Sequence, residues 1–172
     1  MGIISTINPK VKLFCGLIFS NLDVQQSALI KLTECFGSID IVSKFIKFDF
    51  TNYYNNEFGN NLIRCWISFK KLITADSIAT VKILTNNIEH HLSVKGKRTI
   101  NIDPGYITSA SVILVTTKNF SHRIYLRDGI YGEVTMIYNN KQFTKLPWTY
   151  QDYLSEIAKK FFLTIRGFKS YE

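Results

Sequence analysis

The sequence has few of the residues that mark specialised architectures. Its 172 residues include three prolines and nine glycines, and no stretch is rich enough in Pro, Gly or Ser to form a linker. The cysteines, Cys15, Cys35 and Cys65, are widely spaced without a CxxC pair, which argues against a disulfide framework and a zinc site. No run of about 18 apolar residues occurs, and the N-terminus does not resemble a signal peptide. We therefore expect one globular domain over residues 1–172, cytoplasmic and without a membrane partner.

Charge and hydrophobicity narrow the class further. The chain has 21 basic and 13 acidic residues, a net charge of +8, which favours anionic partners such as nucleic acid, nucleotides or phosphorylated metabolites. The lysines are spread along the chain without a basic run, so a dedicated nucleic-acid surface is less favoured than a small anionic ligand, although nucleic acid stays an alternative. With 46% hydrophobic residues the chain can form a core, which excludes a disordered protein.

Hydrophobic periodicity predicts strands and helices in a mixed order over the first part of the chain. Residues 11–20 are almost entirely apolar, as in a strand buried on both faces. Apolar residues at helical spacing predict two helices, and alternation predicts further strands. The expected elements are a strand over 11–20, a helix over 23–36, strands over 39–50 and 63–69, a helix over 74–88 and a strand over 97–102. This βαββαβ order is that of ferredoxin-like folds.

The second part of the chain is predicted to be mainly extended. Pro104-Gly105 is expected to form a turn, followed by strands over 111–117, 122–126, 130–138 and 142–145 and by a helix over 150–166. We therefore predict an α+β fold with a ferredoxin-like βαββαβ start, extended by an antiparallel β-meander and a C-terminal helix.

Several short segments carry a resemblance to one family. They are KLFCGLIFS (12–20), FDFT (48–51), NIDPGY (101–106), HRIYL (122–126) and DGIY (128–131). Together they are similar to the bacterial family DUF4416, a domain of unknown function, over nearly the whole chain. The chain departs from the family pattern at Phe58 and Gln151. Some family members are labelled GTP-binding, but this sequence has neither a GxxxxGK[ST] loop nor a Rossmann glycine pattern.

The candidate catalytic residues lie mainly in one predicted hairpin. His122, Arg123, Asp128 and Glu133 fall within it, and Asp103 lies before the preceding strand. If the strands pair in sequence order, these side chains meet near one end of the sheet. We predict acid–base roles for His122, Glu133 and Asp103, and a divalent cation such as Mg²⁺ held by Asp128 and Glu133. The alternative is a set of cross-strand ion pairs, with Asp128-Gly129 forming only a turn.

Basic and aromatic residues complete the predicted site. Guanidinium and ammonium groups bind phosphate oxygens. The basic candidates for this role are Arg123, Lys118, Arg98 and Arg64. Tyr54 and Asp49 lie in or beside an irregular segment after a strand, where Tyr54 is predicted to stack on a base. The alternative is an ordinary loop whose tyrosines cover the core.

Three functional hypotheses follow. The first is a metal-assisted enzyme or binding protein for a nucleotide or another phosphorylated small molecule. The second is an RNA-binding module whose sheet presents aromatic residues to bases, although the predicted strands lack the RRM signature. The third is a non-catalytic scaffold that binds a protein partner.

Overall fold

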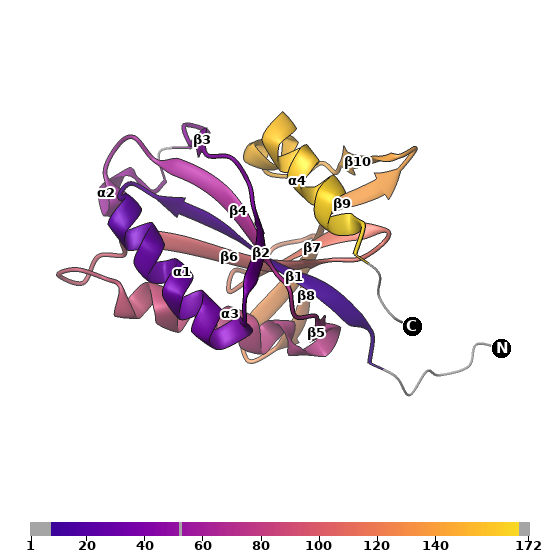
Figure 1. Cartoon of the computed structure of the whole chain (residues 1–172), viewed down its shortest axis with the longest axis horizontal. Helices are drawn as coiled ribbons and strands as arrows, with labels where there is room; N and C mark the ends of the chain where they lie inside the picture. Colours follow the sequence, from indigo (N-terminus) through magenta and orange to yellow (C-terminus); the bar gives the residue numbers. More distant parts are fainter. Residues whose placement is uncertain (1–7, 52, 169–172) are drawn as a thin grey trace.

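A ten-stranded antiparallel sheet forms the centre of the computed structural model, which describes residues 8–51 and 53–168 (Figure 1). Its main path has the order β10-β9-β7-β6-β1-β4-β2, with β3 beside β4, β5 beside β1 and β8 beside β9. All pairings between the described strands are antiparallel. The strands are β1 (Lys10–Phe19), β2 (Ile39–Val42), β3 (Ile46–Lys47), β4 (Ile63–Phe69), β5 (Ile73–Thr74), β6 (Ile100–Ile107), β7 (Ser111–Thr116), β8 (Ile124–Arg127), β9 (Ile130–Asn139) and β10 (Gln142–Lys145).

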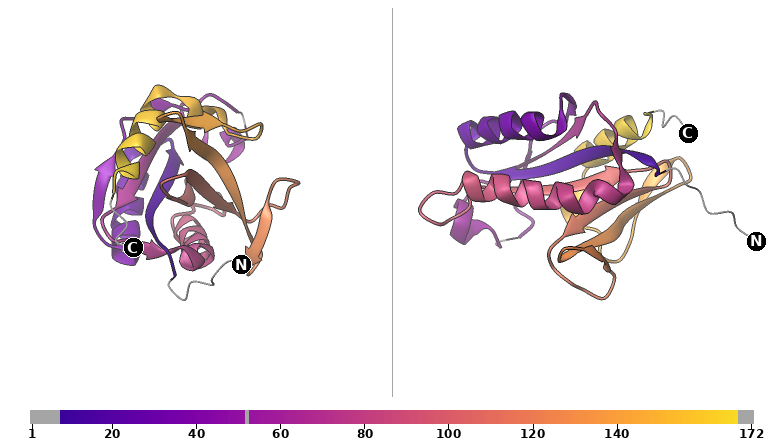
Figure 2. Two further views of the ribbon diagram at one scale, coloured as in Figure 1. Left: turned by 90° about the vertical axis from the view of Figure 1, so that its right-hand side faces the viewer. Right: turned by 90° about the horizontal axis from the view of Figure 1, so that it is seen from below.

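Helices cover both faces of the sheet (Figure 2). The helices of the described chain are α1 (Leu22–Phe36), α2 (Asn55–Phe58), α3 (Ile78–His91) and α4 (Glu156–Arg166), with 3₁₀ turns η1 (Ala75–Ser77) and η2 (Gln151–Leu154). Helices α1 and α3 pack on one face, and α4 with η2 packs on the other. Among these helices, none has both the length and the apolar character of a membrane span. The protein is therefore an α+β protein with a large antiparallel sheet, as the sequence predicts.

Strand β1 lies inside the sheet and is buried on both faces. Leu13 and Leu17 contribute to the core beneath α1 and α3. Phe14 points to the opposite face, where its ring meets Phe162 of α4 edge-on with centroids 5.0 Å apart. This confirms the prediction that the apolar segment 11–20 is a strand covered on both sides.

The turn predicted at Pro104-Gly105 is wrong, because both residues lie inside β6. A side chain at Gly105 would place Cβ 2.3 Å from the carbonyl oxygen of Ile113, so this glycine lets β6 and β7 approach each other. Pro104 has no N–H to donate, and the paired register between β6 and β7 ends one residue away, at Gly105 and Leu114. Pro104 and Gly105, whose residue types suggest a turn, instead lie where the pairing of β6 with β7 ends.

The single strand predicted over 39–50 is also wrong, because it is divided into β2 and β3. Between them the backbone N–H of Ser43 donates to the carbonyl of Trp66, and the Ser43 hydroxyl accepts from the Trp66 N–H. Beyond β3, the described residues of segment 48–62 fold over the sheet, where Phe48, Phe58 and Leu62 pack on Ile18. This segment forms one wall of the cavity described next.

Candidate functional site

A cavity of about 480 Å³ lies where β6 and β7 separate, between segment 48–54, α3 and η2. Before Gly105 on β6 and after Leu114 on β7, the described residues of the two strands are no longer paired with each other. The cavity therefore enters the sheet at the gap between β6 and β7. Its charged lining side chains are Arg64, Lys82, Glu89, Arg98, Asp103, Lys118, Glu133 and Asp152.

Two side chains of α3 lie along the edge of β6 where β7 no longer pairs with it. The Lys82 Nζ donates to the carbonyl of Ile102 at 3.0 Å, and the Ile102 N–H donates to Glu89 Oε1 at 2.6 Å. A buried backbone group without a hydrogen-bond partner is costly. Lys82 and Glu89 therefore bind the carbonyl and N–H groups of Ile102, which a neighbouring strand would otherwise pair with. Burial raises the pKa of Glu89, although Lys82 acts in the opposite direction. The separation of the sheet thus places a carboxylate and an ammonium at the cavity wall.

Arg64 of β4 forms the floor of the cavity and is 1% exposed. Its Nε lies 2.9 Å from Asp152 Oδ2, and its Nη2 donates to the Tyr153 hydroxyl at 3.2 Å. Its guanidinium lies over Gly16 of β1, where a Cβ would come within 2.6 Å of Nη2. Burial lowers the pKa of Arg64, but the electrostatic effects of Asp152, Tyr153, Asp103 and Tyr54 together outweigh burial, so the net pKa is raised. Arg64 is therefore a permanently charged group held in a fixed position.

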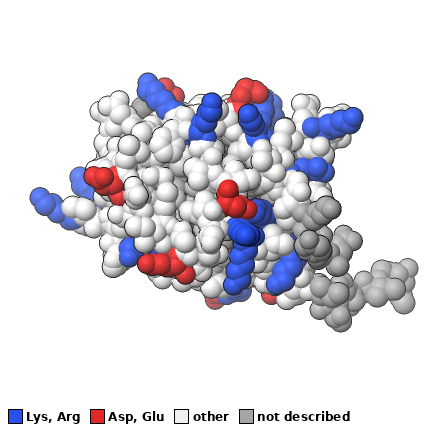
Figure 3. Space-filling view, viewed as in Figure 1, with Lys and Arg blue, Asp and Glu red and all other residues white. Residues whose placement is uncertain are grey.

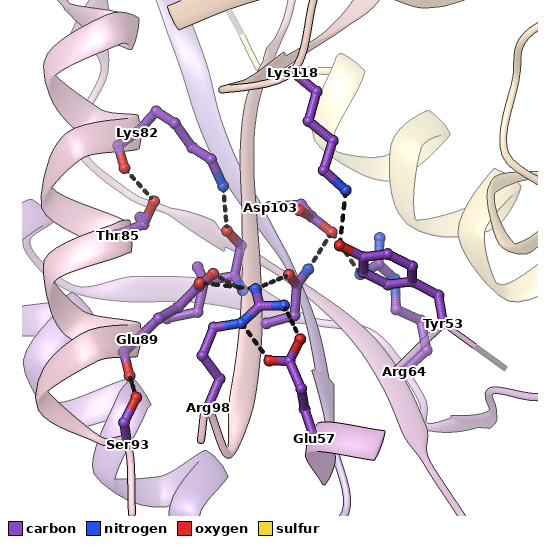
Figure 4. Close-up of polar contacts among 12 residues, drawn as sticks. Tyr53, Glu57, Arg64, Lys82, Thr85, Glu89, Ser93, Arg98, Asp103 and Lys118 are labelled. Atoms are coloured by element: carbon purple, nitrogen blue, oxygen red, sulfur yellow. Dashed lines mark hydrogen bonds and ion pairs between the residues drawn. The ribbon is translucent and has the colours of Figure 1, made fainter. Parts of the chain in front are cut away.

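Asp103 of β6 is the carboxylate that faces the cavity from this floor (Figure 4). Its Oδ2 accepts from Asn101 Nδ2 at 2.7 Å and from Arg64 Nη1 at 3.4 Å. Among the described residues, no hydrogen bond is made to its Oδ1, and the side chain is 31% exposed. Asp103 thus offers one oxygen to a ligand while the other is fixed by the protein.

Arg98 connects the cavity wall to α2 (Figure 4). Its Nε and Nη2 donate to both oxygens of Glu57, at 2.7 and 3.0 Å, and its Nη1 donates to Asn101 Oδ1 at 3.1 Å and Glu89 Oε2 at 3.3 Å. The hydrogen bonds from Arg98 lower the pKa of Glu57. Since its donors are committed to protein acceptors, Arg98 fixes segment 48–62 against β6.

The mouth of the cavity combines a lysine with aromatic rings. Lys118 Nζ donates to the Tyr53 hydroxyl at 3.0 Å, and Tyr53 meets Tyr54 edge-on at 5.0 Å. Tyr54 stacks on Phe58 with centroids 5.2 Å apart, and its burial raises its pKa. Tyr54 is therefore partly committed to the loop core, whereas Tyr53 and Lys118 are exposed at the opening.

The predicted group around Glu133 does come together, but as a support for the cavity wall. Arg123 Nε donates to Glu133 Oε2 at 2.8 Å, and His122 Nε2 lies 3.1 Å from the same oxygen. Arg123 also donates from Nη1 to the Lys118 carbonyl at 3.0 Å and from Nη2 to the Tyr150 hydroxyl at 2.9 Å. Glu133 lines the cavity, whereas His122 and Arg123 do not. Arg123 therefore holds in place the backbone that carries Lys118.

Two predicted site residues lie away from the cavity. Asp49 forms an exposed ion pair with Lys47 at 3.2 Å. Asp128 occupies the turn between β8 and β9 with φ 52° and pairs with Arg127. In residues 8–51 and 53–168, no group of three or more His, Cys, Asp or Glu is placed to hold a metal ion. The structure thus does not bring Asp128 and Glu133 together around a common cation position.

Several cavity residues were not predicted from the sequence. Lys82 and Glu89 lie seven residues apart on the α3 face that also buries Ile78 and Thr85. Charged residues on an apolar helix stripe are a readable signal, because burial of a charge requires a partner. Asp152 had no such signal, since its partner Arg64 is distant in the sequence.

Comparison with known protein families identifies the family of this chain. The model of the family described as "Domain of unknown function (DUF4416)" matches residues 9–168. No curated protein and no solved structure matches the chain.

Proposed function

Because the chain belongs to the DUF4416 family, a domain of unknown function, we propose its function from the cavity itself: the protein binds a small phosphorylated molecule there. The cavity volume of about 480 Å³ lies within the range of roughly 300–1,000 Å³ that is typical of small-molecule sites. Its lining combines aromatic rings with eight charged side chains, a more polar composition than that of most small-molecule sites and one that suits a charged ligand.

The observation that carries this proposal is the state of two ammonium groups. Lys118 Nζ donates to the Tyr53 hydroxyl and Lys82 Nζ to a backbone carbonyl, and among the described residues neither is hydrogen-bonded to a carboxylate. Arg64 and Arg98, in contrast, are paired with carboxylates. An ammonium has three N–H donors, so both lysines retain donors for an anion. Phosphate oxygens suit such donors.

The arrangement favours a small molecule over RNA. Both faces of the sheet are covered in the described structure, by α1 and α3 on one side and by α4 and segment 48–62 on the other. Bases therefore have no open sheet on which to stack. On the face shown in Figure 3, Lys and Arg side chains are dispersed and interspersed with Asp and Glu. This face therefore lacks the continuous basic path that tracks a nucleic-acid backbone.

The predicted divalent cation is not part of this proposal. Asp128 lies outside the cavity, and both Glu133 oxygens already accept hydrogen bonds, Oε2 from Arg123 and Oε1 from the Thr135 hydroxyl. A cation that accompanies a nucleotide remains testable by adding Mg²⁺ to the binding assay.

Calorimetric titration and thermal unfolding with inorganic phosphate, pyrophosphate, ribose 5-phosphate and GMP test the proposal. A ligand at about 100 times its Kd stabilises the folded state by roughly 2.7 kcal/mol. Lys118→Ala should weaken binding about tenfold or more, since a charge-assisted hydrogen bond is lost. Lys159→Ala is the matched control, because Lys159 is also a surface lysine but pairs with Glu156 outside the cavity.

Two outcomes would contradict the proposal. The first is that no phosphorylated compound stabilises the protein, with or without Mg²⁺. The second is that the two lysine variants bind equally well. Binding of an oligoribonucleotide that weakens steeply with salt and depends on many lysines would instead favour the RNA-binding hypothesis.

We also propose two finer assignments. The order β6-β1-β4-β2, with α1 and α3 on one face, supports a ferredoxin-like start. The free thiols of Cys15, Cys35 and Cys65 support a cytoplasmic location. Comparison with an experimentally determined structure tests the first, and localisation of a tagged protein tests the second.

A further inference from the structure

We infer that Asp103 binds a hydroxyl group of the ligand, so that the phosphorylated molecule is one with free hydroxyls, as in sugar phosphates and nucleotides. This inference rests on the proposed function, because it assumes that the cavity holds a phosphorylated compound. It adds the chemical group that the second half of the ligand must carry.

The first step is the hydrogen-bonding state of the Asp103 carboxylate. Oδ2 accepts from Asn101 and Arg64, whereas Oδ1 accepts from no described residue and the side chain lines the cavity. An ionised carboxylate only accepts hydrogen bonds. The ligand group at Oδ1 must therefore be a donor, and a phosphate oxygen does not fit because like charges repel.

The cavity presents an ammonium and a carboxylate that come from different elements. Lys118 enters from just beyond β7 at the mouth, whereas Asp103 projects from β6 beside the buried Arg64 (Figure 4). A phosphate at Lys118 and a hydrogen-bond donor at Asp103 satisfy both groups at once. The ligand is therefore bifunctional, with an anionic group and a neutral donor separated by a short carbon skeleton.

Neither a positively charged amine nor a metal ion suits the open oxygen of Asp103. A positively charged amine at Asp103 would also approach Arg64, whose guanidinium Nη1 lies 3.4 Å from Oδ2, and this repulsion disfavours it. A metal ion needs more donors than one open carboxylate oxygen supplies, and no cluster of three or more suitable side chains is found among the described residues. A hydroxyl has one donor, no charge and a good geometry for a carboxylate acceptor.

The last step is the fixed orientation of the acceptor. Asn101 Nδ2 holds Oδ2 at 2.7 Å, and Asn101 Oδ1 is in turn fixed by Arg98 at 3.1 Å. Arg64 is held over Gly16 by Asp152 and Tyr153. Oδ1 is thus presented in one position, which lowers the conformational entropy that the Asp103 side chain loses when a ligand binds.

The test compares two phosphates with the same number of carbon atoms. Ribose 5-phosphate carries hydroxyls, and pentyl phosphate carries none. Calorimetry gives Kd for both compounds with the wild type, Asp103→Ala, Asp103→Asn and Lys118→Ala. Asp103→Ala should weaken ribose 5-phosphate about tenfold or more, the effect of losing a hydrogen bond to a charged acceptor. Pentyl phosphate should bind as before or more tightly. Asp103→Asn retains an acceptor oxygen and should have a smaller effect on the sugar phosphate.

Each result either supports or overturns the hydroxyl assignment. A loss of affinity confined to ribose 5-phosphate supports it. If Asp103→Ala does not fold, the same comparison of the two compounds is made with Asp103→Asn. Equal changes for both compounds overturn it while leaving the proposed function intact, provided that Lys118→Ala weakens both. If neither compound binds the wild type, or if Lys118→Ala has no effect, the proposed function fails and this inference fails with it.

Discussion

Gly16→Ala is the substitution that most directly tests the buried floor of the cavity. A Cβ at this position would lie 2.6 Å from Nη2 and 2.8 Å from Cζ of Arg64, closer than ordinary Cβ contacts. The guanidinium cannot simply move away, because Asp152 lies 2.9 Å from its Nε and Tyr153 accepts from its Nη2. The added methyl must therefore displace a charged group that has no access to water.

The size of the effect follows from overpacking of a closed interior. Extra methyl groups in a packed core cost about 1–3 kcal/mol. For a chain of this length, each kcal/mol lowers Tm by roughly 2–4 °C. We therefore expect Gly16→Ala to lose about 2 kcal/mol and to melt about 4–8 °C lower. Urea unfolding and thermal unfolding monitored by circular dichroism measure both quantities.

Two other strand glycines provide matched controls. At Gly132 the nearest atom to a built Cβ is Leu126 Cδ1 at 3.4 Å, so Gly132→Ala should leave stability nearly unchanged. At Gly105 the Cβ would meet a backbone oxygen at 2.3 Å, so Gly105→Ala should cost more than Gly16→Ala. Equal stability of the Gly16 and Gly132 variants would refute the argument. So would an undiminished Gly16→Ala loss in an Arg64→Met background, where the guanidinium is gone.

Two further predictions concern ionisable groups. Glu57 has its pKa lowered from 4.5 by hydrogen bonds from Arg98, so its stabilising contribution is present above pH 4.5 and is lost as pH falls through the lowered pKa. The difference in urea stability between wild type and Glu57→Gln should therefore shrink on acidification, and a constant difference would contradict this. Burial raises the pKa of Cys65 to about 12 and also raises that of the buried Cys15, whereas Cys35 is exposed. A thiol reagent at pH 8 should label Cys35 alone in the native protein and all three cysteines in urea, as counted by mass spectrometry.

Local patterns predict much of the secondary structure because burial repeats at the period of each element. The continuous apolar segment 11–20 matches β1, which has neighbours on both edges and helices on both faces. The helical spacing of Ala28, Leu32 and Phe36 matches α1, whose buried side includes these residues. In both cases the sequence signal is the burial itself.

Pro104 and Gly105 show where such local reasoning fails. Both residue types favour turns, and their dihedral preferences are the same in any isolated segment. What keeps them in β6 is the neighbouring strand: Gly105 lies against the backbone of β7, and Pro104 adjoins the point where the pairing ends. A sequence reveals this arrangement only once the partner strand is known.

The candidate site was predictable only in part for the same reason. Asp103 and Glu133 were identifiable as carboxylates in short polar segments, and both line the cavity. Asp128 also lies in a short polar segment, yet it occupies a hairpin turn with positive φ, a conformation that Asp adopts more readily than most residues. Sequence gives the residue types, but the cavity depends on which strands separate.

The charged floor is itself an argument for a ligand. Hydrogen bonds and ion pairs connect Glu57 through Arg98, Asn101, Asp103 and Arg64 to Asp152. This series joins α2 to η2 across the cavity. Replacing a buried ion pair by apolar groups is often neutral or stabilising, so stability alone gives little reason for a buried arginine on β4. Recognition does give a reason, because a fixed guanidinium orients Asp103 and leaves one carboxylate oxygen facing the cavity. The burial of Arg64 therefore favours the proposed binding role of the cavity.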